Sequence, residues 1–265
     1  MQHRMRPRFR YGIYLAVWAL SFGWSGVGAQ RGWAQDIDAI IQRHLEVMGG
    51  VERLQSVQSM HMKGTMLFQG VEAPVEFWFQ RPNRVRIETT FQGQKFVQAY
   101  DGETAWWIMP FMGDPTPKPM PEAQAKRFIE NSQDFLSPFI DYKEKGYTVE
   151  LVGEEEIEGT PVYHIRLKKR SERVIEYFLD KETAVLLRTR AEIQRENQTI
   201  QSETVFGDYQ QVEGIAIPFS IQSYVNGQLM SQMTVQQVEI NPEIDPALFH
   251  MPKTEKTTEQ PLQRH

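Results

Sequence analysis

Histidine residues are the first candidates for catalysis or metal binding, and this chain of 265 residues has six histidines and no cysteine. No two of them have the helical or strand spacing that would place a pair of metal ligands on one face. The histidines stand at His3, His44, His61, His164, His250 and His265. Without cysteine there is no thiol nucleophile, and neither a Gly-rich phosphate loop after a strand nor a Gly-x-Ser-x-Gly elbow occurs. We therefore predict no metal site, no cofactor and no catalytic residues.

Acidic residues are common, but their positions are typical of turns and solvated surface. Glu154, Glu155 and Glu156 form a run beside a turn, which indicates an exposed strand edge. Asp101 precedes Gly102, and this pair is favoured for its turn geometry, so the carboxylate needs no chemical role. An enzyme would need a site assembled from dispersed residues, and we rank that reading lowest.

Apolar side chains exceed what an ordinary sheet requires. Met60, Met62 and Met66 stand beside Phe68. A second group comprises Trp106, Trp107, Met109, Phe111, Met112 and Met120. Methionine is unbranched and soft, so it can pack against acyl chains or fill an irregular core. A stripe on one strand face does not distinguish an open groove from a filled core, and both interpretations stay open on the spacing alone.

The first residues predict export. Residues 1–10 are basic and lack acids, and residues 11–24 form an apolar run that falls short of the roughly 20 residues a membrane span needs. We predict a signal peptide over 1–34, with cleavage after Ala34 or Ala29, and a periplasmic location. The absence of cysteine also excludes a lipid-modified N-terminal cysteine and disulfides, so burial alone must hold the fold. A net charge of −5 that includes the basic leader argues against nucleic acid as a partner.

The elements that follow the leader read as one helix and then a long series of strands. Apolar residues recur at helical spacing from Ile37 to Met48, with Asp36 as a candidate N-cap and Gly49 and Gly50 as the stop. Beyond Val57 the period changes to two, and Asn-Gly, Asp-Gly and Glu-Gly turns punctuate the series. About eleven or twelve antiparallel strands are expected in one sheet over 35–252, a number that favours strong curling or partial closure.

The series is interrupted between its two halves. Residues 113–121 are rich in proline and are expected not to continue a strand ladder. Residues 122–136 predict a helix with Phe128 on its apolar face, which either covers the sheet or packs as an ordinary core helix. The polar residues 253–265 predict a disordered tail.

Three short motifs, in order and at matching distances, carry a resemblance to a known family. Phe79-Gln80-Arg81-Pro82-Asn83 ends a strand, and the segment from Tyr100-Asp101-Gly102 through Trp106 to Pro110 follows. Asp245-Pro246-Ala247-Leu248-Phe249 stands near the end. Together they resemble the LolA-like periplasmic lipoprotein carriers. The resemblance implies an α+β fold, mainly β: a strongly curved, incompletely closed antiparallel β-barrel of about 11 strands, with helices covering the concave face.

The resemblance also implies a site. Arg81 matches the family arginine that latches the lid through hydrogen bonds to backbone carbonyls, and Val85 stands where the family commonly has an aromatic residue. The second half, over 150–209, is longer and more charged than in the proteobacterial carriers. The predicted lipid cavity is lined by Met60, Met62, Met66, Phe77, Phe79, Val85, Ile87, Trp107, Met109 and Phe128.

The function that follows is a periplasmic carrier, not an enzyme, that shelters the acyl chains of a lipoprotein or related amphiphile for transfer towards the outer membrane. Its partners would be the lipidated cargo, an inner-membrane donor and an outer-membrane acceptor, with the carrier itself a monomer. The alternative is a lipid-sensing regulator or scaffold of the same fold that binds an envelope membrane protein.

Overall fold

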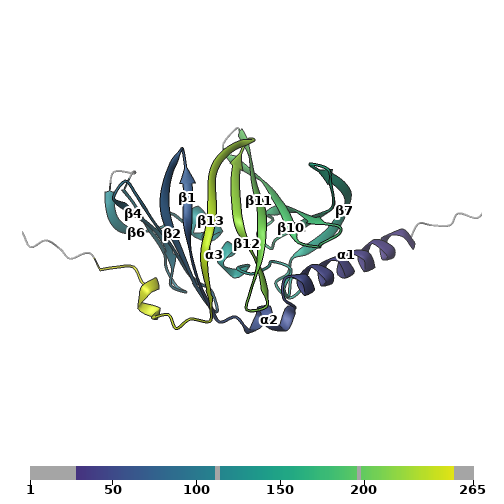
Figure 1. Ribbon diagram of the computed structural model, residues 1–265, viewed down its shortest axis with the longest axis horizontal. Helices are drawn as coiled ribbons and strands as arrows, with labels where there is room; N and C mark the ends of the chain where they lie inside the picture. The colour runs from purple at the N-terminus through teal and green to yellow at the C-terminus, as the bar shows by residue number, and fades with distance from the viewer. Residues whose placement is uncertain (1–27, 111–113, 196–197, 254–265) are drawn as a thin grey trace, which may run out of the picture.

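A single antiparallel sheet dominates the computed structural model, which describes residues 28–110, 114–195 and 198–253 (Figure 1). Its order is β6-β5-β4-β3-β2-β1-β13-β12-β11-β10-β9-β8-β7, so β6 and β7 are the two edges. The strands are β1 (Ser59–Phe68), β2 (Val71–Gln80), β3 (Arg84–Phe91), β4 (Gln94–Tyr100), β5 (Ala105–Met109), β6 (Asp114–Pro119), β7 (Thr148–Ile157), β8 (Thr160–Lys168), β9 (Val174–Asp180), β10 (Leu186–Arg195), β11 (Gln198–Val212), β12 (Ile215–Val225) and β13 (Gln228–Ile240). The sheet curves strongly and does not close, as expected.

The strand count corrects the prediction, because the sheet has 13 strands rather than about 11. The clearest omission is β6, which lies in the proline-rich segment that was expected to interrupt the ladder. β6 pairs with β5 through Trp106 opposite Pro119 and Trp107 opposite Lys118. Proline lacks an N–H donor, but an edge strand needs only one of its two sides for pairing, so the edge tolerates it.

Two helices differ from their predicted bounds. α1 (Gly28–Val47) begins before Asp36, which lies inside the helix instead of capping it. Residues 28–35 contain no proline, and Ala29, Gln30, Arg31, Ala34 and Gln35 are good helix formers, so the helix extends through the expected start despite Gly32. α3 (Glu122–Gln133) ends before Leu136, because the N–H of its C-cap Asp134 bonds back to the carbonyl of Asn131.

The main core lies between the concave face of the sheet and the helices. α1 buries Ile37, Ile41 and Leu45, and the short α2 (Val51–Ser56) buries Leu54. α3 lies behind β13 in the view of Figure 1, and its Phe128 packs in a cluster with Tyr100 of β4 and Ala105 of β5. Of the two interpretations of this helix, covering the sheet is the one the structure shows.

The convex face carries the C-terminal motif. Phe249 is fully buried at the end of the 3-10 helix η2 (Pro246–Phe249), and its carbonyl accepts a hydrogen bond of 2.8 Å from the Trp106 indole. Arg86 donates to the Leu248 carbonyl at 3.0 Å and lies over the Trp106 ring. The Trp106 side chain is fully buried in this packing on the convex side, so it does not reach the concave face. The predicted leader and polar tail lie largely outside the described residues.

Candidate functional site

Two adjoining cavities occupy the concave face. The first has a volume of about 330 Å³ and is lined from α1, α2, the segment after α3 and the strands of the second half. The second, of about 360 Å³, is lined from β1, β2, β3 and α3. Met60, Met62, Asp134 and Phe135 line both cavities, so the two are neighbours along one groove.

Register explains why so many apolar side chains face this groove. Met60 pairs with Phe79, and Met62 pairs with Phe77 across β1 and β2. Directly paired residues of an antiparallel ladder project from the same face, and alternate residues of each strand share it. The period-two pattern therefore places the methionine and phenylalanine stripes together on the concave side.

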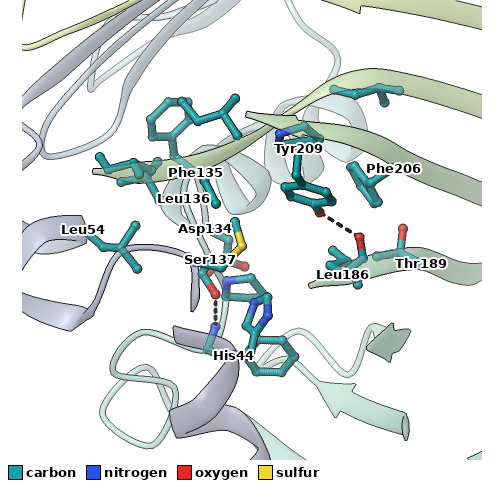
Figure 2. A pocket seen from close by; sticks show the side chains of 18 of the residues that line it. His44, Leu54, Asp134, Phe135, Leu136, Ser137, Leu186, Thr189, Phe206 and Tyr209 are labelled. Carbon is teal, nitrogen blue, oxygen red and sulfur yellow. Dashed lines mark hydrogen bonds between the residues drawn. The ribbon is translucent and has the colours of Figure 1, made fainter. Parts of the chain in front are cut away.

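The segment that follows α3 divides the groove. Phe135 leaves the helix end and stacks on Phe79, with ring centroids 3.7 Å apart and planes 12° apart. Farther along this segment, the Phe139 amide donates to the Ser137 hydroxyl at 3.2 Å (Figure 2). Residues 134–139, here named the plug segment, thus fill the middle of the groove and separate the two cavities.

The polar groups around the first cavity are largely satisfied within the protein. The Tyr209 hydroxyl donates to the Leu186 carbonyl at 2.7 Å, and burial raises the pKa of this phenol well above its usual range (Figure 2). Nδ1 of His44 lies 2.8 Å from the Ala184 carbonyl, which can only accept, so this nitrogen carries the proton. Desolvation lowers the pKa of His44, which keeps the ring neutral. The cavity is therefore suited to an apolar ligand.

A buried ionic cluster holds the start of the plug segment. The Asp134 carboxylate lies 2.7 Å from the ammonium of Lys169 and 3.1 Å from that of Lys145. The side chains of Asp134 and Lys169 are only 9% and 2% exposed. The Tyr147 hydroxyl lies 3.3 Å from the same carboxylate, and burial together with Asp134 raises the pKa of that phenol. Lys169 follows β8, so the cluster ties the plug segment to a strand distant in sequence.

Arg81 makes backbone contacts of the kind expected of a latch, but to α2. Its Nε donates to the Val57 carbonyl at 2.7 Å, and one terminal nitrogen donates to the Leu54 carbonyl at 3.3 Å. Both carbonyls lie at the C-terminal end of α2, where a helix leaves acceptors without intrahelical partners. The guanidinium thus fixes α2 against the β2–β3 turn, and its role as a lid latch stays a prediction.

Most of the predicted cavity residues lie around the groove. Met60 and Met62 line both cavities, and the second cavity also has Phe77, Phe79, Val85, Ile87 and Phe128. Met66 instead packs beside Val75 and Met233, nearer the hairpin end of β1. Trp107 packs with the apolar residues of α3, and Met109 pairs with Asp114 and lines neither cavity. Lipid binding by these residues stays a prediction.

Sequence reasoning missed the second-half wall of the groove. Phe206, Ile217, Ile221 and Thr189 line the first cavity, and none stands in a methionine-rich or motif-bearing segment. Their period-two positions carry a signal, because Phe206 pairs with Ile221 across β11 and β12. Phe135 stands at helical spacing from Phe128 within the predicted helix 122–136, but α3 ends at Gln133, so its stacking on Phe79 was not predicted.

Within the described ranges, no group of three or more metal-ligating side chains comes together, and no helix has both the length and the apolarity for a membrane span.

Comparisons with known proteins identify the family and the fold. The family model that matches the chain is described as an uncharacterized protein and spans residues 79–255. No curated protein matches.

Three solved structures share the fold at low identity. A DUF1329 family protein from Desulfovibrio piger has a TM-score of 0.54 at 12% identity, over 81% of this chain and 97% of that chain. A LolA superfamily protein from Nitrosomonas europaea has a TM-score of 0.53 at 11% identity, over 80% and 96%. A domain described as outer membrane lipoprotein-sorting, from Vibrio parahaemolyticus, has a TM-score of 0.52 at 12% identity, over 80% and 94%.

Proposed function

We infer a function from the premise that this chain belongs to the family of uncharacterized proteins matched over residues 79–255 and that it has a LolA-like fold. We propose that the protein is a periplasmic carrier that takes acyl chains of a lipoprotein or related amphiphile into the groove on its concave face. It is proposed to act by binding, without a covalent step. Its leader would direct it to the periplasm.

The observation that carries the proposal is the divided groove. Two cavities of about 330 and 360 Å³ adjoin along an apolar face, and Phe135 of the plug segment lines both of them. Ligand sites in proteins are concave, mostly apolar and usually preformed. An acyl chain entering either cavity would leave water at about 0.8 kcal/mol for each CH₂ group, so several chains could be held firmly without covalent chemistry.

The plug segment provides a mechanism for loading. Phe135 occupies the middle of the groove and contacts Phe79, one of the residues that an acyl chain would touch. If Phe135 swings away, the two cavities join into one longer groove. The lipid then replaces an internal aromatic contact by its own contact, which lowers the net cost of opening.

Transfer of the bound lipid would require an acceptor with a higher affinity for it. It would not require hydrolysis. The proposed partners are an inner-membrane donor of lipidated protein and an outer-membrane acceptor, and the lining residues of the groove supply affinity without recognising a particular protein. A carrier must release its cargo, so partial filling of the groove by its own side chains is an advantage.

Titration with a fluorescent acyl probe tests the proposal. Thr189 is half-buried and lines the first cavity, so Thr189→Arg would place a cation in the groove and should weaken probe binding at least about tenfold. Thr90 is exposed and lines neither cavity, so Thr90→Arg is the matched control and should bind like the wild type.

Absence of saturable probe binding, together with no lipid on protein isolated from the envelope, would overturn the carrier. Stable capture of one inner-membrane protein without lipid transfer would favour the regulator instead.

A further inference from the structure

Three hairpin tips at one margin of the sheet carry no charged residue. They are the β1–β2, β3–β4 and β12–β13 tips, at residues 67–71, 91–94 and 225–231. The strands β4, β3, β2, β1, β13 and β12 are consecutive in the sheet, so the tips follow one another along the margin. In Figure 1 the β1, β2 and β13 ends lie at the top, opposite α2. These tips are named the hairpin rim.

The hairpin rim exposes large apolar side chains. Leu67, Phe68, Val71 and Leu229 are 36%, 37%, 37% and 50% exposed. Phe68 also contacts Phe91 of the next hairpin edge to face, with ring centroids 6.4 Å apart. Scattered apolar residues on a surface are ordinary, but a contiguous apolar group marks an interaction site.

Turns at the opposite margin are charged. The β2–β3 turn carries Arg81, the β4–β5 turn Glu103, the β9–β10 turn Lys181 and the β11–β12 turn Glu213. Since both margins are built from hairpins of one sheet, solvation by itself would favour polar tips at both. The β8–β9 tip lies at the same margin as the hairpin rim and carries Lys168, Lys169 and Arg170. The lack of charge is therefore particular to the hairpin rim and is not a property of either margin.

The hairpin rim is continuous with the groove. Phe68 pairs with Val71 and Met66 pairs with Ala73, on the same face as the Met62–Phe77 pair that lines the second cavity. Met66 and Phe77 are only half-buried. A chain that moves along the concave face from the second cavity thus reaches the hairpin rim without crossing a charged strip of β1 or β2.

We propose that the hairpin rim docks on a lipid bilayer and inserts its apolar side chains among the lipid headgroups. Charged side chains are costly inside a membrane, and these tips have none. Each inserted apolar side chain gains by leaving water. With a net charge of −5, the chain would be repelled rather than attracted by anionic lipid, so apolar insertion is the force that remains. The purpose of docking, passage of an acyl chain between bilayer and groove, rests on the proposed function; the docking itself does not.

Co-flotation with vesicles of phosphatidylethanolamine and phosphatidylglycerol tests the docking. The variant Phe68→Ser/Leu229→Ser should reduce vesicle binding by about tenfold for each side chain, the order expected when a large apolar group no longer leaves water. Raising the salt concentration should leave wild-type binding unchanged or make it slightly stronger, because salt screens the repulsion between the acidic chain and phosphatidylglycerol and does not weaken apolar contacts.

The control is Val152→Ser on the acid-rich edge strand β7, where Val152 is 41% exposed. It should float like the wild type. Acyl-probe titration of the rim variant separates the two proposals: intact probe binding with lost flotation supports bilayer docking by the hairpin rim. Flotation that survives the rim substitutions, or that high salt abolishes, would overturn it. Failure of the wild type to bind pure lipid vesicles would also overturn bilayer docking. The hairpin rim would then be assigned to a protein partner.

Discussion

Phe135 stacks on Phe79 with ring centroids 3.7 Å apart, and this contact closes the middle of the groove. The first prediction is that Phe135→Ala joins the two cavities. We expect the unfolding free energy to fall by about 1–3 kcal/mol, less than for a fully buried aromatic residue because Phe135 is half-buried. Acyl probes of greater chain length should gain affinity relative to short ones. Phe135→Leu keeps most of the volume and should show neither effect as strongly. An unchanged chain-length preference in Phe135→Ala would argue against a plug.

The second prediction concerns the buried Asp134–Lys169 pair, 2.7 Å apart. Lys169→Met leaves the Asp134 carboxylate buried with fewer partners and should cost about 2–4 kcal/mol of unfolding free energy. Asp134→Leu combined with Lys169→Met removes both charges and should recover much of that loss. Lys143→Met removes an exposed partner of Asp38 and should have no measurable effect. Equal losses in both single variants would contradict a special role for the buried pair. Denaturant unfolding measures all four proteins.

The third prediction concerns Arg81, whose two donors hold the end of α2. Arg81→Lys keeps the charge but loses the fork of donors, so about 1 kcal/mol of unfolding free energy should be lost. Hydrogen exchange of α2 amides should become faster. Arg84→Lys is the control, because Arg84 donates to the Asp101 carbonyl and to Gln80 instead. Accelerated α2 exchange in the control variant would show that the effect is not specific to Arg81.

The fourth prediction is a pH dependence set by His44. Desolvation lowers the pKa of His44 in the folded protein below its ordinary value of about 6.5. As the pH falls below about 6.5, the unfolded chain binds a proton that the folded state resists, so the stability falls with decreasing pH. His44→Gln can still donate to the Ala184 carbonyl but does not titrate, and this component should disappear from its stability profile. A variant whose profile parallels the wild type would exclude His44 as the source.

The fifth prediction uses two glycines of the same sheet. A Cβ at Gly64 would lie 2.4 Å from the backbone oxygen of Thr234, at the register shift between β1 and β13. Gly64→Ala should therefore destabilise the protein by about 2 kcal/mol or more, since backbone must move. Gly153 has open space at its Cβ position, so Gly153→Ala should be neutral or stabilise by about 0.5 kcal/mol. Thermal unfolding of both variants tests the contrast.

Sequence periodicity determined the strands and their faces. The alternation of Met60, Met62 and Phe77 predicts a common face because side chains of a strand alternate, and this needs no knowledge of the neighbouring strands. The helix over 122–133 also follows from local spacing. Asp101 and Asp245 of the family motifs stabilise turns. Each carboxylate accepts hydrogen bonding from backbone amides two or three residues later in the chain.

Only the tertiary structure decided how open the groove is. Local spacing predicts Phe135 within a helix, whereas its stacking on Phe79 and the ion pair of the preceding Asp134 with Lys169 are contacts between segments distant in sequence. The proline-rich β6 likewise forms only because it lies at an edge, where one side needs no partner. The two interpretations of the apolar stripe, groove and core, are both partly right. One segment of the chain fills the middle of the groove, and a cavity lies on each side of it, because long-range contacts set where that segment lies.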